Sequence, residues 1–441
     1  MIRVVEGARD LLPADMLLQK WLSQQIESVL ALYGFEPWDS PLLEYRSLYT
    51  EHSNEDLVNQ QAFTFYDIEG NEVVLRSELT PSLARVVAMH HEDLDLPLRW
   101  YSYGPFWRNE NLVPGRGREF RQWNIDTVGI PEPVADVELV LQAIHHLENF
   151  GFKDSQVVIK MNNRALLRRN LFSFGIPEEL FGRLVRLLDR ASKSKQVDFY
   201  GEAERCGCSL SQLQALEDYL QDDSLWKEDE LLSTIFDAAE KLGRRAYLQY
   251  EPKIIRFPLY YTGLVFEAFD RQGLYPAILG GGRYDLLIQN VGGFALPAAG
   301  FAIGNITLVE LMRDKGLLPH LKNRPPVLLA AAAAISHLPH VTQLAQELRL
   351  LGYSVEVSPQ IGARQHQLDY ARLNRVPLVA FLPGTPHPHA TVELIDTLNQ
   401  NHQLFDSLPE VISHFANGKR ACLAANGPGL KEWEKEVTRA S

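Results

Sequence analysis

The densest group of charged and polar residues lies between Arg108 and Asp126, where the sequence reads R-N-E-N-L-V-P-G-R-G-R-E-F-R-Q-W-N-I-D. Gly115 and Gly117 predict a mobile loop within this segment. Arginine guanidinium groups are planar and permanently charged, so they suit the oxygens of a phosphate chain. The segment therefore predicts a loop that holds a triphosphate, although a surface hairpin with scattered arginines is the alternative. Its four arginines are Arg108, Arg116, Arg118 and Arg121.

Three further motifs combine polar residues with turn or strand signals. Taken singly, each also fits a tight turn, a capping acid or an aromatic pair in the core. In the first, Glu78 is a carboxylate that could hold a substrate ammonium, and Thr80 stands at a plausible helix cap. In the third, three successive glycines let the backbone approach a ligand or another strand closely. The motifs are Leu75-Arg76-Ser77-Glu78-Leu79-Thr80-Pro81, Ile255-Arg256 followed by Tyr260-Tyr261-Thr262-Gly263, and Gly280-Gly281-Gly282-Arg283-Tyr284-Asp285.

Short β-rich segments separated by turn residues must position these motifs. They predict one antiparallel sheet, interrupted in the sequence and then resumed. Apolar residues at helical spacing predict helices over 17–32, 135–147 and 308–314, the second with acids near its start, where a helix favours them. The strand segments are 63–67, 73–76, 98–101, 120–128, 247–250, 254–256, 260–269, 275–279 and 299–304.

The chain divides into regions of different pattern. Residues 163–241 are largely helical and unlike their flanks, which predicts an insertion between a first part of the core, 1–162, and a second part, 242–322. Pro325-Pro326 then marks a boundary. Beyond it, strand-like and helical segments alternate over 326–425, as in a small α/β domain.

Composition narrows the function classes. The 441 residues carry 43 basic and 56 acidic side chains, a net charge of −13, so any contact with RNA must be local. We find neither an N-terminal leader nor an apolar run long enough for a membrane span, and we expect a cytoplasmic protein. Cys206 and Cys208 lack partners at metal-ligand spacing, so we expect reduced thiols and no metal site. A basic stretch between Lys160 and Lys195 fits either solvated helices or a phosphate-facing surface.

Taken together and in this order, the motifs resemble the histidyl-tRNA synthetases, which are class II aminoacyl-tRNA synthetases, over nearly the full length. The opening Glu6 to Pro13 is similar to the start of that family, and Gly34 to Pro41 is similar to class II motif 1, which forms the family's dimer interface. The resemblance implies an α+β fold with an antiparallel sheet flanked by helices, a helical insertion and a C-terminal α/β domain like the anticodon-binding module.

The resemblance also implies roles for individual residues. Arg108 matches the motif 2 arginine that contacts the α-phosphate of ATP, and Arg256 matches an arginine near the substrate carboxylate and that phosphate; both are expected to be catalytic. Glu110 matches the position that reads adenine, and Arg116 and Arg118 match the loop arginines. The residues expected to bind histidine are Glu78, Thr80, Gln122, Asp126, Tyr260 and Tyr261.

The implied function is a histidine–tRNA ligase. Histidine and ATP would form histidyl-adenylate, and the 3′ end of tRNA-His would then attack the activated carboxyl. A fixed arginine charge suits such an in-line displacement. The expected partners are histidine, ATP accompanied by Mg²⁺, tRNA-His and a second copy of the chain in a homodimer, without a membrane.

Three departures from the family pattern keep other functions open. Phe257-Pro258-Leu259 stands where a glycine is usual, no arginine follows Gly304 in the motif 3 region, and the late strand carries Glu393 and Asp396 where a lysine is common. One alternative is a non-catalytic paralogue such as the regulatory subunit of ATP phosphoribosyltransferase, disfavoured by the C-terminal domain and the retained arginines. Another is a paralogue that activates an amino acid for a carrier other than tRNA.

Overall fold

The structure is a computed structural model that describes residues 2–52, 61–112, 115–193, 198–256, 259–321, 327–383, 392–399 and 401–424. Its internal contacts divide the chain into two units, Met1–Leu321 and Lys322–Ser441. Each unit has its own core, so each is described by itself. The expected boundary at Pro325-Pro326 and the altered pair Phe257-Pro258 lie outside the described residues.

An eight-stranded sheet forms the centre of the first unit, in the order β1-β5-β6-β11-β10-β9-β7-β8. From β5 to β7 in this order, neighbouring strands pair antiparallel, which confirms the predicted sheet, whereas the edge strands β1 and β8 are parallel to their neighbours. The strands are β1 (Glu36–Pro37), β5 (Leu98–Trp107), β6 (Glu119–Val128), β7 (Val157–Asn163), β8 (Leu248–Tyr250), β9 (Leu264–Asp270), β10 (Leu279–Arg283) and β11 (Ala298–Gly304).

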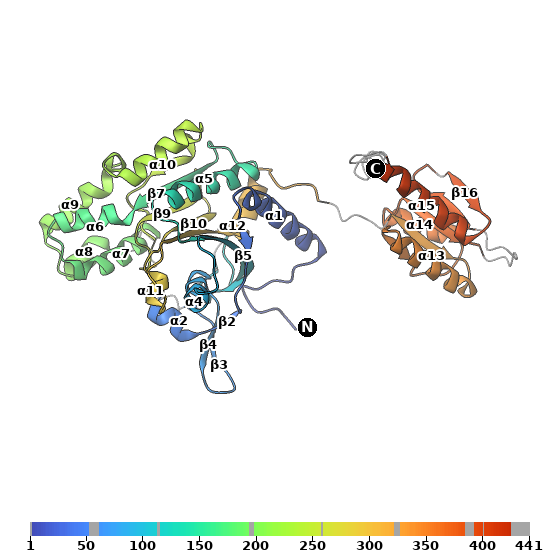
Figure 1. The fold of residues 1–441 in the computed structure, drawn as a ribbon, viewed down its shortest axis with the longest axis horizontal. Coiled ribbons are helices and arrows are strands. Elements are labelled where there is room, and N and C mark those ends of the chain that lie inside the picture. The colour runs from blue at the N-terminus through green and yellow to red at the C-terminus, as the bar shows by residue number, and fades with distance from the viewer. Residues whose placement is uncertain are drawn as a thin grey trace. The chain divides into compact units, whose positions relative to one another are not determined.

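Helices α1 (Pro13–Leu32), α5 (Val134–Asn149) and α10 (Glu230–Lys241) cover one face of this sheet (Figure 1). Side chains alternate along a strand, so β6 sends Trp123 and Ile125 into the core beneath these helices. The intervening Gln122, Asn124 and Asp126 consequently point to the opposite face. A polar row on one strand thereby faces away from the main core.

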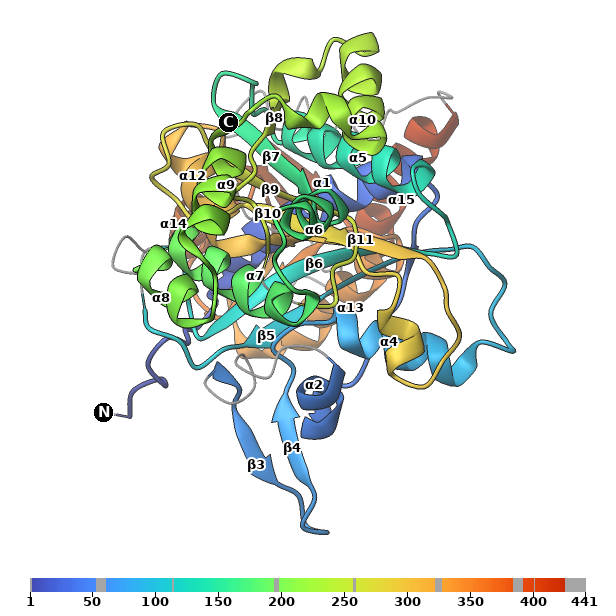
Figure 2. The ribbon, with the colours of Figure 1, turned by 90° about the vertical axis from the view of Figure 1, so that its left-hand side faces the viewer.

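The opposite face is covered in part by α4 (Thr80–His90) and α11 (Leu287–Asn290), which share an apolar cluster with the sheet. A separate three-stranded sheet, in the order β2-β4-β3, projects beside them (Figure 2). It was wrong to predict that 63–67 and 73–76 join the main sheet. The turn from Asp67 to Asn71 closes these segments on each other, and the free edge of β4 pairs with β2 instead. The elements are β2 (Leu43–Tyr45), α2 (Arg46–His52), β3 (Thr64–Tyr66) and β4 (Glu72–Leu75).

The helices between β7 and β8 form two groups. The earlier helices enclose an apolar cluster of their own, whereas α10 packs its apolar face with α5 into the main core. The insertion with its own cluster thus ends before α10. These elements, with α12 after the last strand, are α6 (Arg164–Ser173), α7 (Glu178–Lys193), α8 (Phe199–Arg205), α9 (Leu210–Gln221), η1 (Leu225–Glu228), η2 (Arg245–Tyr247) and α12 (Asn305–Asp314).

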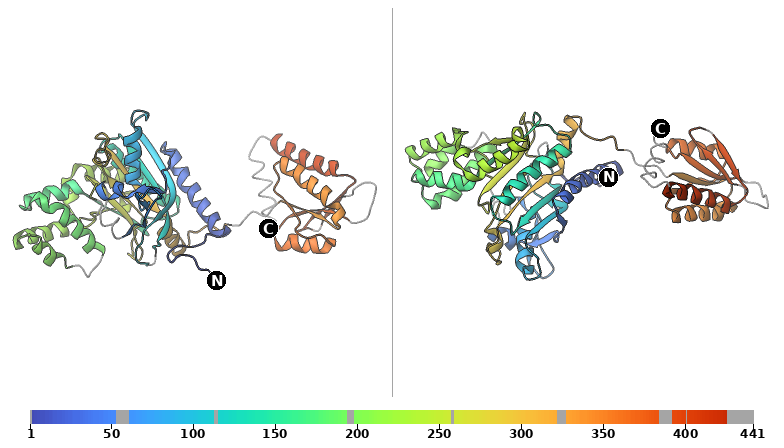
Figure 3. Two further views of the ribbon diagram at one scale, coloured as in Figure 1. Left: turned by 90° about the horizontal axis from the view of Figure 1, so that it is seen from below. Right: turned by 45° about the horizontal axis from the view of Figure 1, so that its top comes forward.

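The second unit is a five-stranded sheet in the order β13-β12-β14-β15-β16, with helices on both faces (Figure 3). On β12, Leu328 and Ala330 pack toward α13 and α15, and Leu329 and Ala331 pack toward α14. The predicted alternation of strands and helices is confirmed here. The elements are β12 (Leu328–Ala332), η3 (Ile335–His337), α13 (Leu338–Leu350), β13 (Val355–Val357), α14 (Arg364–Leu373), β14 (Leu378–Leu382), β15 (Val392–Asp396), β16 (His402–Phe405) and α15 (Leu408–Ala424).

The acids of the late strand have structural partners. Arg364 donates two hydrogen bonds to the Glu393 carboxylate, at 2.7 and 2.8 Å. Asp396 accepts hydrogen bonds from the backbone amides of Leu398 and Asn399 in the following turn. Since a lysine is common on this strand in the family, the two acids are expected to weaken contact with phosphate, and this stays a prediction. In the part of the chain that the structure describes, no helix has the length and apolar character to cross a membrane.

Candidate active site

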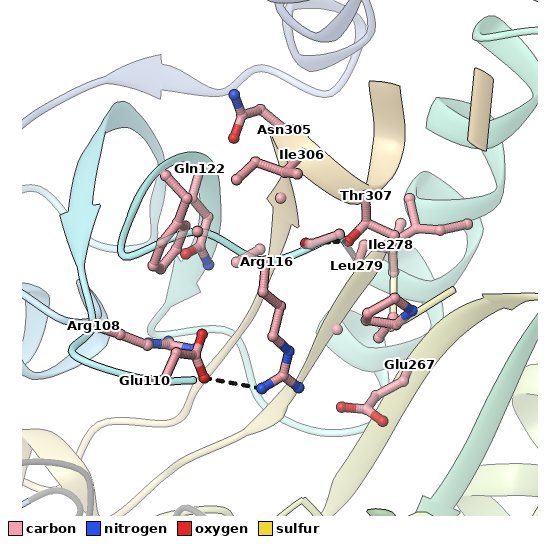
Figure 4. A pocket seen from close by; sticks show the side chains of 18 of the residues that line it. Arg108, Glu110, Arg116, Gln122, Glu267, Ile278, Leu279, Asn305, Ile306 and Thr307 are labelled. Carbon is pink, nitrogen blue, oxygen red and sulfur yellow. Dashed lines mark hydrogen bonds and ion pairs between the residues drawn. The ribbon is translucent and has the colours of Figure 1, made fainter. Parts of the chain in front are cut away.

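A cleft with an empty volume of about 810 Å³, including the part that opens to solvent, lies on the face of the sheet away from α1 and α5 (Figure 4). The loop before β6 lines one side, and the segment before β10 and the first turn of α12 line the other. The cleft brings together five predicted site residues that are far apart in the sequence: Arg108, Glu110, Arg116, Gln122 and Arg256.

Arg108 is fixed at the end of β5. Its Nε donates to the carbonyl oxygen of Ser77 at 3.0 Å, and its guanidinium lies 5.2 Å from the centre of the Phe120 ring. Burial lowers the pKa of Arg108, while the nearby carboxylates of Glu78 and Glu110 oppose that effect. Arginine remains charged under such a shift, so the cleft keeps a fixed cation beside the Glu78 segment.

The two loop arginines occupy different environments. Arg116 forms an ion pair with Glu110, with 2.9 Å between the nearest nitrogen and oxygen, and its side chain extends across the cleft (Figure 4). Arg118 instead lies against the opening segment, where it donates to the carbonyl oxygen of Glu6 at 3.3 Å and packs on Gly7. Arg118 does not line the cleft, and its contact with ATP stays a prediction.

Arg256 enters the cleft from a loop rather than from the strand that we predicted over 254–256. Its backbone has a φ of +48°, a left-handed conformation that costs a non-glycine residue about 1–3 kcal/mol. Its guanidinium pairs with Glu267 at 2.7 Å and lies 5.5 Å from the centre of the Tyr261 ring. A Cβ on Gly280 would lie 1.8 Å from an Arg256 nitrogen, so the absence of a side chain there makes room for this arginine.

A second polar group surrounds Glu78. Its carboxylate accepts a 2.8 Å hydrogen bond from the Tyr260 hydroxyl, and its backbone carbonyl accepts one from Tyr49 at 3.0 Å. Burial and the Glu78 charge raise the pKa of Tyr260 well above its usual range, so this hydroxyl stays a donor. Thr80 is the first residue of α4, and Leu79 occupies the cap position, so the predicted Thr80 cap is wrong.

Asp126 closes the far end of the same group. Tyr284 donates to its carboxylate at 2.5 Å, and the Tyr284 and Tyr260 rings meet edge to face with 6.1 Å between their centres. Burial raises the pKa of Asp126 to about 7, although the hydrogen bond from Tyr284 favours the charged form. Two buried carboxylates, Glu78 and Asp126, are therefore linked through a pair of tyrosines.

The glycine-rich motif is strand β10. It ends at Arg283, which is 1% exposed and forms an ion pair of 2.5 Å with Asp136 of α5, itself 0% exposed. A second nitrogen of Arg283 reaches Asp285 at 2.7 Å. This buried pair joins the strand beside the site to the helix layer behind the sheet, so it supports the site without lining it.

Two expectations concern metals and thiols. Within the described ranges, no group of three or more His, Cys, Asp or Glu side chains is placed to hold a metal ion. Cys206 and Cys208 are free thiols, at the end of α8 and in the turn that follows it.

Sequence comparison identifies the family. The sequence model described as histidyl-tRNA synthetase matches residues 7–308. The chain belongs to the histidyl-tRNA synthetase family. It is 38% identical over 335 residues to the chloroplastic/mitochondrial histidine–tRNA ligase of Arabidopsis thaliana, covering 72% of this chain and 67% of that one. It is 33% identical over 388 residues to the histidine–tRNA ligase of Haloarcula marismortui, covering 83% and 87%.

Solved structures of histidyl-tRNA synthetases share the fold. The enzyme from a Nostoc species superposes with a TM-score of 0.69 at 21% identity, covering 95% of this chain and 99% of that one. A Bacillus halodurans protein described as an ATP phosphoribosyltransferase regulatory subunit/histidyl-tRNA synthetase also gives 0.69 at 21%, covering 88% and 99%. At this identity the likeness concerns the fold alone, and it confirms the predicted α+β architecture.

Several residues of the site were not predicted from the sequence motifs. Asn124 lies between Gln122 and Asp126 on the same face of β6, and its side-chain amide nitrogen has no partner within the described part of the chain. The alternation of a strand could have identified it. Glu267 and Thr307 were also missed, because their positions in the cleft depend on strand pairing and on where α12 begins.

Replacing Asp126 with asparagine should stabilise the unliganded protein at neutral and alkaline pH. Folding raises the pKa of the Asp126 carboxyl from 3.8 to about 7, so the folded state holds this proton more tightly than the unfolded state does. The free energy of unfolding of the wild type therefore falls as the pH rises through this window. Asparagine mimics the protonated form, so its advantage in the free energy of unfolding should grow from about pH 4 and level off near about 4 kcal/mol above pH 7. Denaturant titrations followed by tryptophan fluorescence would measure it, and an advantage independent of pH would contradict the assignment.

Proposed function

We propose that this chain is a histidine–tRNA ligase, which activates histidine with ATP and transfers it to tRNA-His. The observation that carries the proposal is the junction of two sites. A cleft lined by Arg108, Arg116 and Arg256 lies beside a buried polar group in which Glu78 and Asp126 are linked through Tyr260 and Tyr284. Such an arrangement suits a triphosphate at one end and an amino acid with a polar side chain at the other.

The amino-acid end can recognise two separate groups of histidine. The Glu78 carboxylate, at the buried end near Arg108, suits the α-ammonium group of the substrate. Asp126, Gln122 and Asn124 lie along the same strand face and offer acceptors and donors to the imidazole. A ring N–H that meets Asp126 would favour the ionised carboxylate, and a substrate without such a donor would leave that carboxylate unpaired.

The activation step requires no side-chain base. An oxygen of the histidine carboxylate attacks the α-phosphorus, the bond from that phosphorus to the bridging oxygen breaks, and pyrophosphate leaves. Charge develops on the phosphate oxygens during this displacement, and Arg256 and Arg108 are fixed cations positioned to stabilise it. Because Glu267 and the space at Gly280 hold Arg256 in place, little reorganisation is needed when the substrates react.

In the second step, a hydroxyl at the 3′ end of tRNA-His would attack the activated carboxyl, and AMP would leave. The insertion helices are a candidate contact surface, but some of their arginines are already paired: Arg168 with Glu178, and Arg190 with Glu202 at 3.2 Å. The C-terminal unit is our candidate for the anticodon contact. We propose that the contact with tRNA phosphates on the insertion uses the exposed side chains of Arg169 and Arg183.

We propose that Mg²⁺ enters with ATP rather than through a cage of protein ligands. The carboxylates that line the cleft, Glu110 and Glu267, are each paired with an arginine. A divalent cation bridging the phosphates would offset part of the charge of the triphosphate. Omitting Mg²⁺ and adding a chelator in the activity assay tests this point.

We also propose a homodimer. The β2-β4-β3 sheet exposes large apolar side chains, and its strand registers place Leu43, Tyr45 and Phe65 on the same face. Exposed apolar patches mark interaction surfaces in soluble proteins. Sedimentation velocity of the full chain would show a species of twice 50.0 kDa if the proposal holds, and a monomer at micromolar concentration would contradict it. The exposed side chains are Leu43, Tyr45, Phe65 and Tyr66.

Histidine-dependent exchange of pyrophosphate into ATP tests the first step directly. We expect exchange with histidine and Mg²⁺, little exchange with other amino acids, and charging of tRNA-His by the same preparation. Exchange without charging would indicate a carrier other than this tRNA. No exchange with any amino acid would overturn the ligase and leave a regulatory role.

A further inference from the structure

The loop that carries Arg116 rests on the first turn of α12. The Thr307 hydroxyl donates to the carbonyl oxygen of Gly115 at 3.2 Å, and Thr307 is 5% exposed. A Cβ on the same glycine would lie 3.1 Å from Pro276 and 3.4 Å from the Thr307 hydroxyl oxygen, so this part of the loop is in close contact with both the segment before β10 and α12. Figure 4 shows Thr307 at this side of the cleft.

A second contact lies two residues further along the loop. A Cβ on Gly117 would lie 3.2 Å from the terminal carbon of the Ile306 side chain and 3.2 Å from the Gly7 carbonyl oxygen. Gly115 has a φ of +81°, a conformation that suits glycine, and it therefore presents its carbonyl without a side chain in the way. The two glycines that flank Arg116 therefore both contact α12, and they also contact the segment before β10 and the N-terminal segment at Gly7.

Among the described residues of α12, Thr307 supplies the hydrogen bond to this loop, through its hydroxyl. The Ile306 contact is apolar and would tolerate sliding. Hydrogen bonds fix distance and direction, and this loop has them from Thr307 to the Gly115 carbonyl and from the Arg118 and Glu119 amides to the Gly7 carbonyl. The position of the Arg116 guanidinium, 2.9 Å from Glu110, follows from this anchor and from the backbone between the glycines.

We propose that Thr307 is a positioning residue, which holds the loop at Gly115 so that Arg116 faces the phosphates of ATP in the cleft. Thr307 lines the same cleft and acts through the loop, by the hydrogen bond of its hydroxyl to the Gly115 carbonyl. The inference rests on the proposed function, because it concerns the same cleft. It assigns Thr307 to ATP affinity, with no role in the choice of amino acid.

Thr307→Val tests this inference, because valine keeps the branched shape and removes the hydroxyl. In the exchange assay with the full chain, we expect the KM for ATP to rise roughly threefold to tenfold, the equivalent of one lost hydrogen bond, with the KM for histidine unchanged. Thr307→Ser should restore the wild-type KM for ATP. An unchanged KM for ATP in Thr307→Val, an equal rise in both KM values, or a serine variant as impaired as valine would overturn the inference.

Limited trypsin digestion provides a readout that needs no activity. Cleavage after Arg116 should be roughly threefold to tenfold faster in Thr307→Val than in the wild type and unchanged in Thr307→Ser. Absence of exchange in the wild type would contradict the proposed function. Equal rates of cleavage in the wild type and in Thr307→Val would contradict the inference that Thr307 holds the loop. The matched control is Thr234→Val, since the Thr234 hydroxyl donates to the Glu230 carbonyl at 2.7 Å on α10, away from the cleft.

Discussion

Replacing Arg256 with alanine should lower the rate of histidine-dependent ATP–pyrophosphate exchange by roughly a hundredfold to a thousandfold. The guanidinium is held by Glu267 at 2.7 Å and lies in the space left by Gly280, so it is preorganised beside the reacting phosphate of the proposed complex. Arg256→Lys should recover a part of the rate, because lysine keeps the charge but lacks the planar, two-pronged geometry. The measurement is kcat for exchange at saturating ATP and histidine.

Two controls separate chemistry from folding in this experiment. Arg244→Ala removes an arginine of similar exposure that pairs with Glu148 at 2.6 Å away from the cleft, and its exchange rate should stay near that of the wild type. Arg256→Ala combined with Glu267→Gln removes the carboxylate that the single variant leaves unpaired. An exchange rate within about threefold of the wild type in Arg256→Ala would contradict the assigned role, since removal of such a group costs far more.

Replacing Arg283 with methionine should lower the free energy of unfolding of the first unit by about 3–5 kcal/mol. Arg283 and Asp136 are almost completely buried, and the guanidinium makes contacts of 2.5 and 3.0 Å with that carboxylate. Methionine fills a similar volume but leaves the Asp136 charge without its counter-ion. Denaturant titration followed by tryptophan fluorescence would measure the change, because every tryptophan except Trp433 precedes residue 322.

The companion variants for this prediction concern the same pair and an exposed one. Arg283→Met with Asp136→Asn should recover much of the lost stability, because the unpaired buried charge is then absent. Arg46→Met breaks a partly exposed pair with Glu72, of 3.0 Å, and should cost less than about 1 kcal/mol. A loss for Arg283→Met no larger than that for Arg46→Met would show that Asp136 finds water or another partner.

Much of the fold could be predicted because periodicity depends on local sequence. Most of helix α1, which was predicted from Leu17 and begins at Pro13, and the strand that contains Gln122 follow directly from apolar spacing. The β3 and β4 segments were assigned to the wrong sheet, since a strand pattern does not say which neighbour it pairs with. The Ile254-Ile255 segment has strand composition, yet the chain turns at Arg256 into a left-handed conformation that no composition reveals.

The candidate site also contains residues that the sequence could predict and residues that it could not. Arg108, Glu110, Arg116, Gln122 and Arg256 could be named from motifs, and the structure brings them into one cleft. Glu267, which pairs with Arg256, and Thr307, which bonds to the loop, could not be named from motifs, because each acts through a partner that is distant in the sequence. Arg118 shows the converse, since a motif position does not guarantee that the side chain faces the cleft.

Strand β10 has a consequence for protein engineering. A methyl group at Gly280, Gly281 or Gly282 would meet Arg256, the Gly300 carbonyl or the Leu264 carbonyl, at 1.8, 2.0 and 2.3 Å. None of the three positions therefore has room for a side chain, so substitution on β10 cannot reshape the site gradually. Attempts to evolve acceptance of a different amino acid have to begin on β6, which is separated from β10 by β11 in the same sheet, at Gln122, Asn124 and Asp126, where side chains already occupy the face of the proposed site.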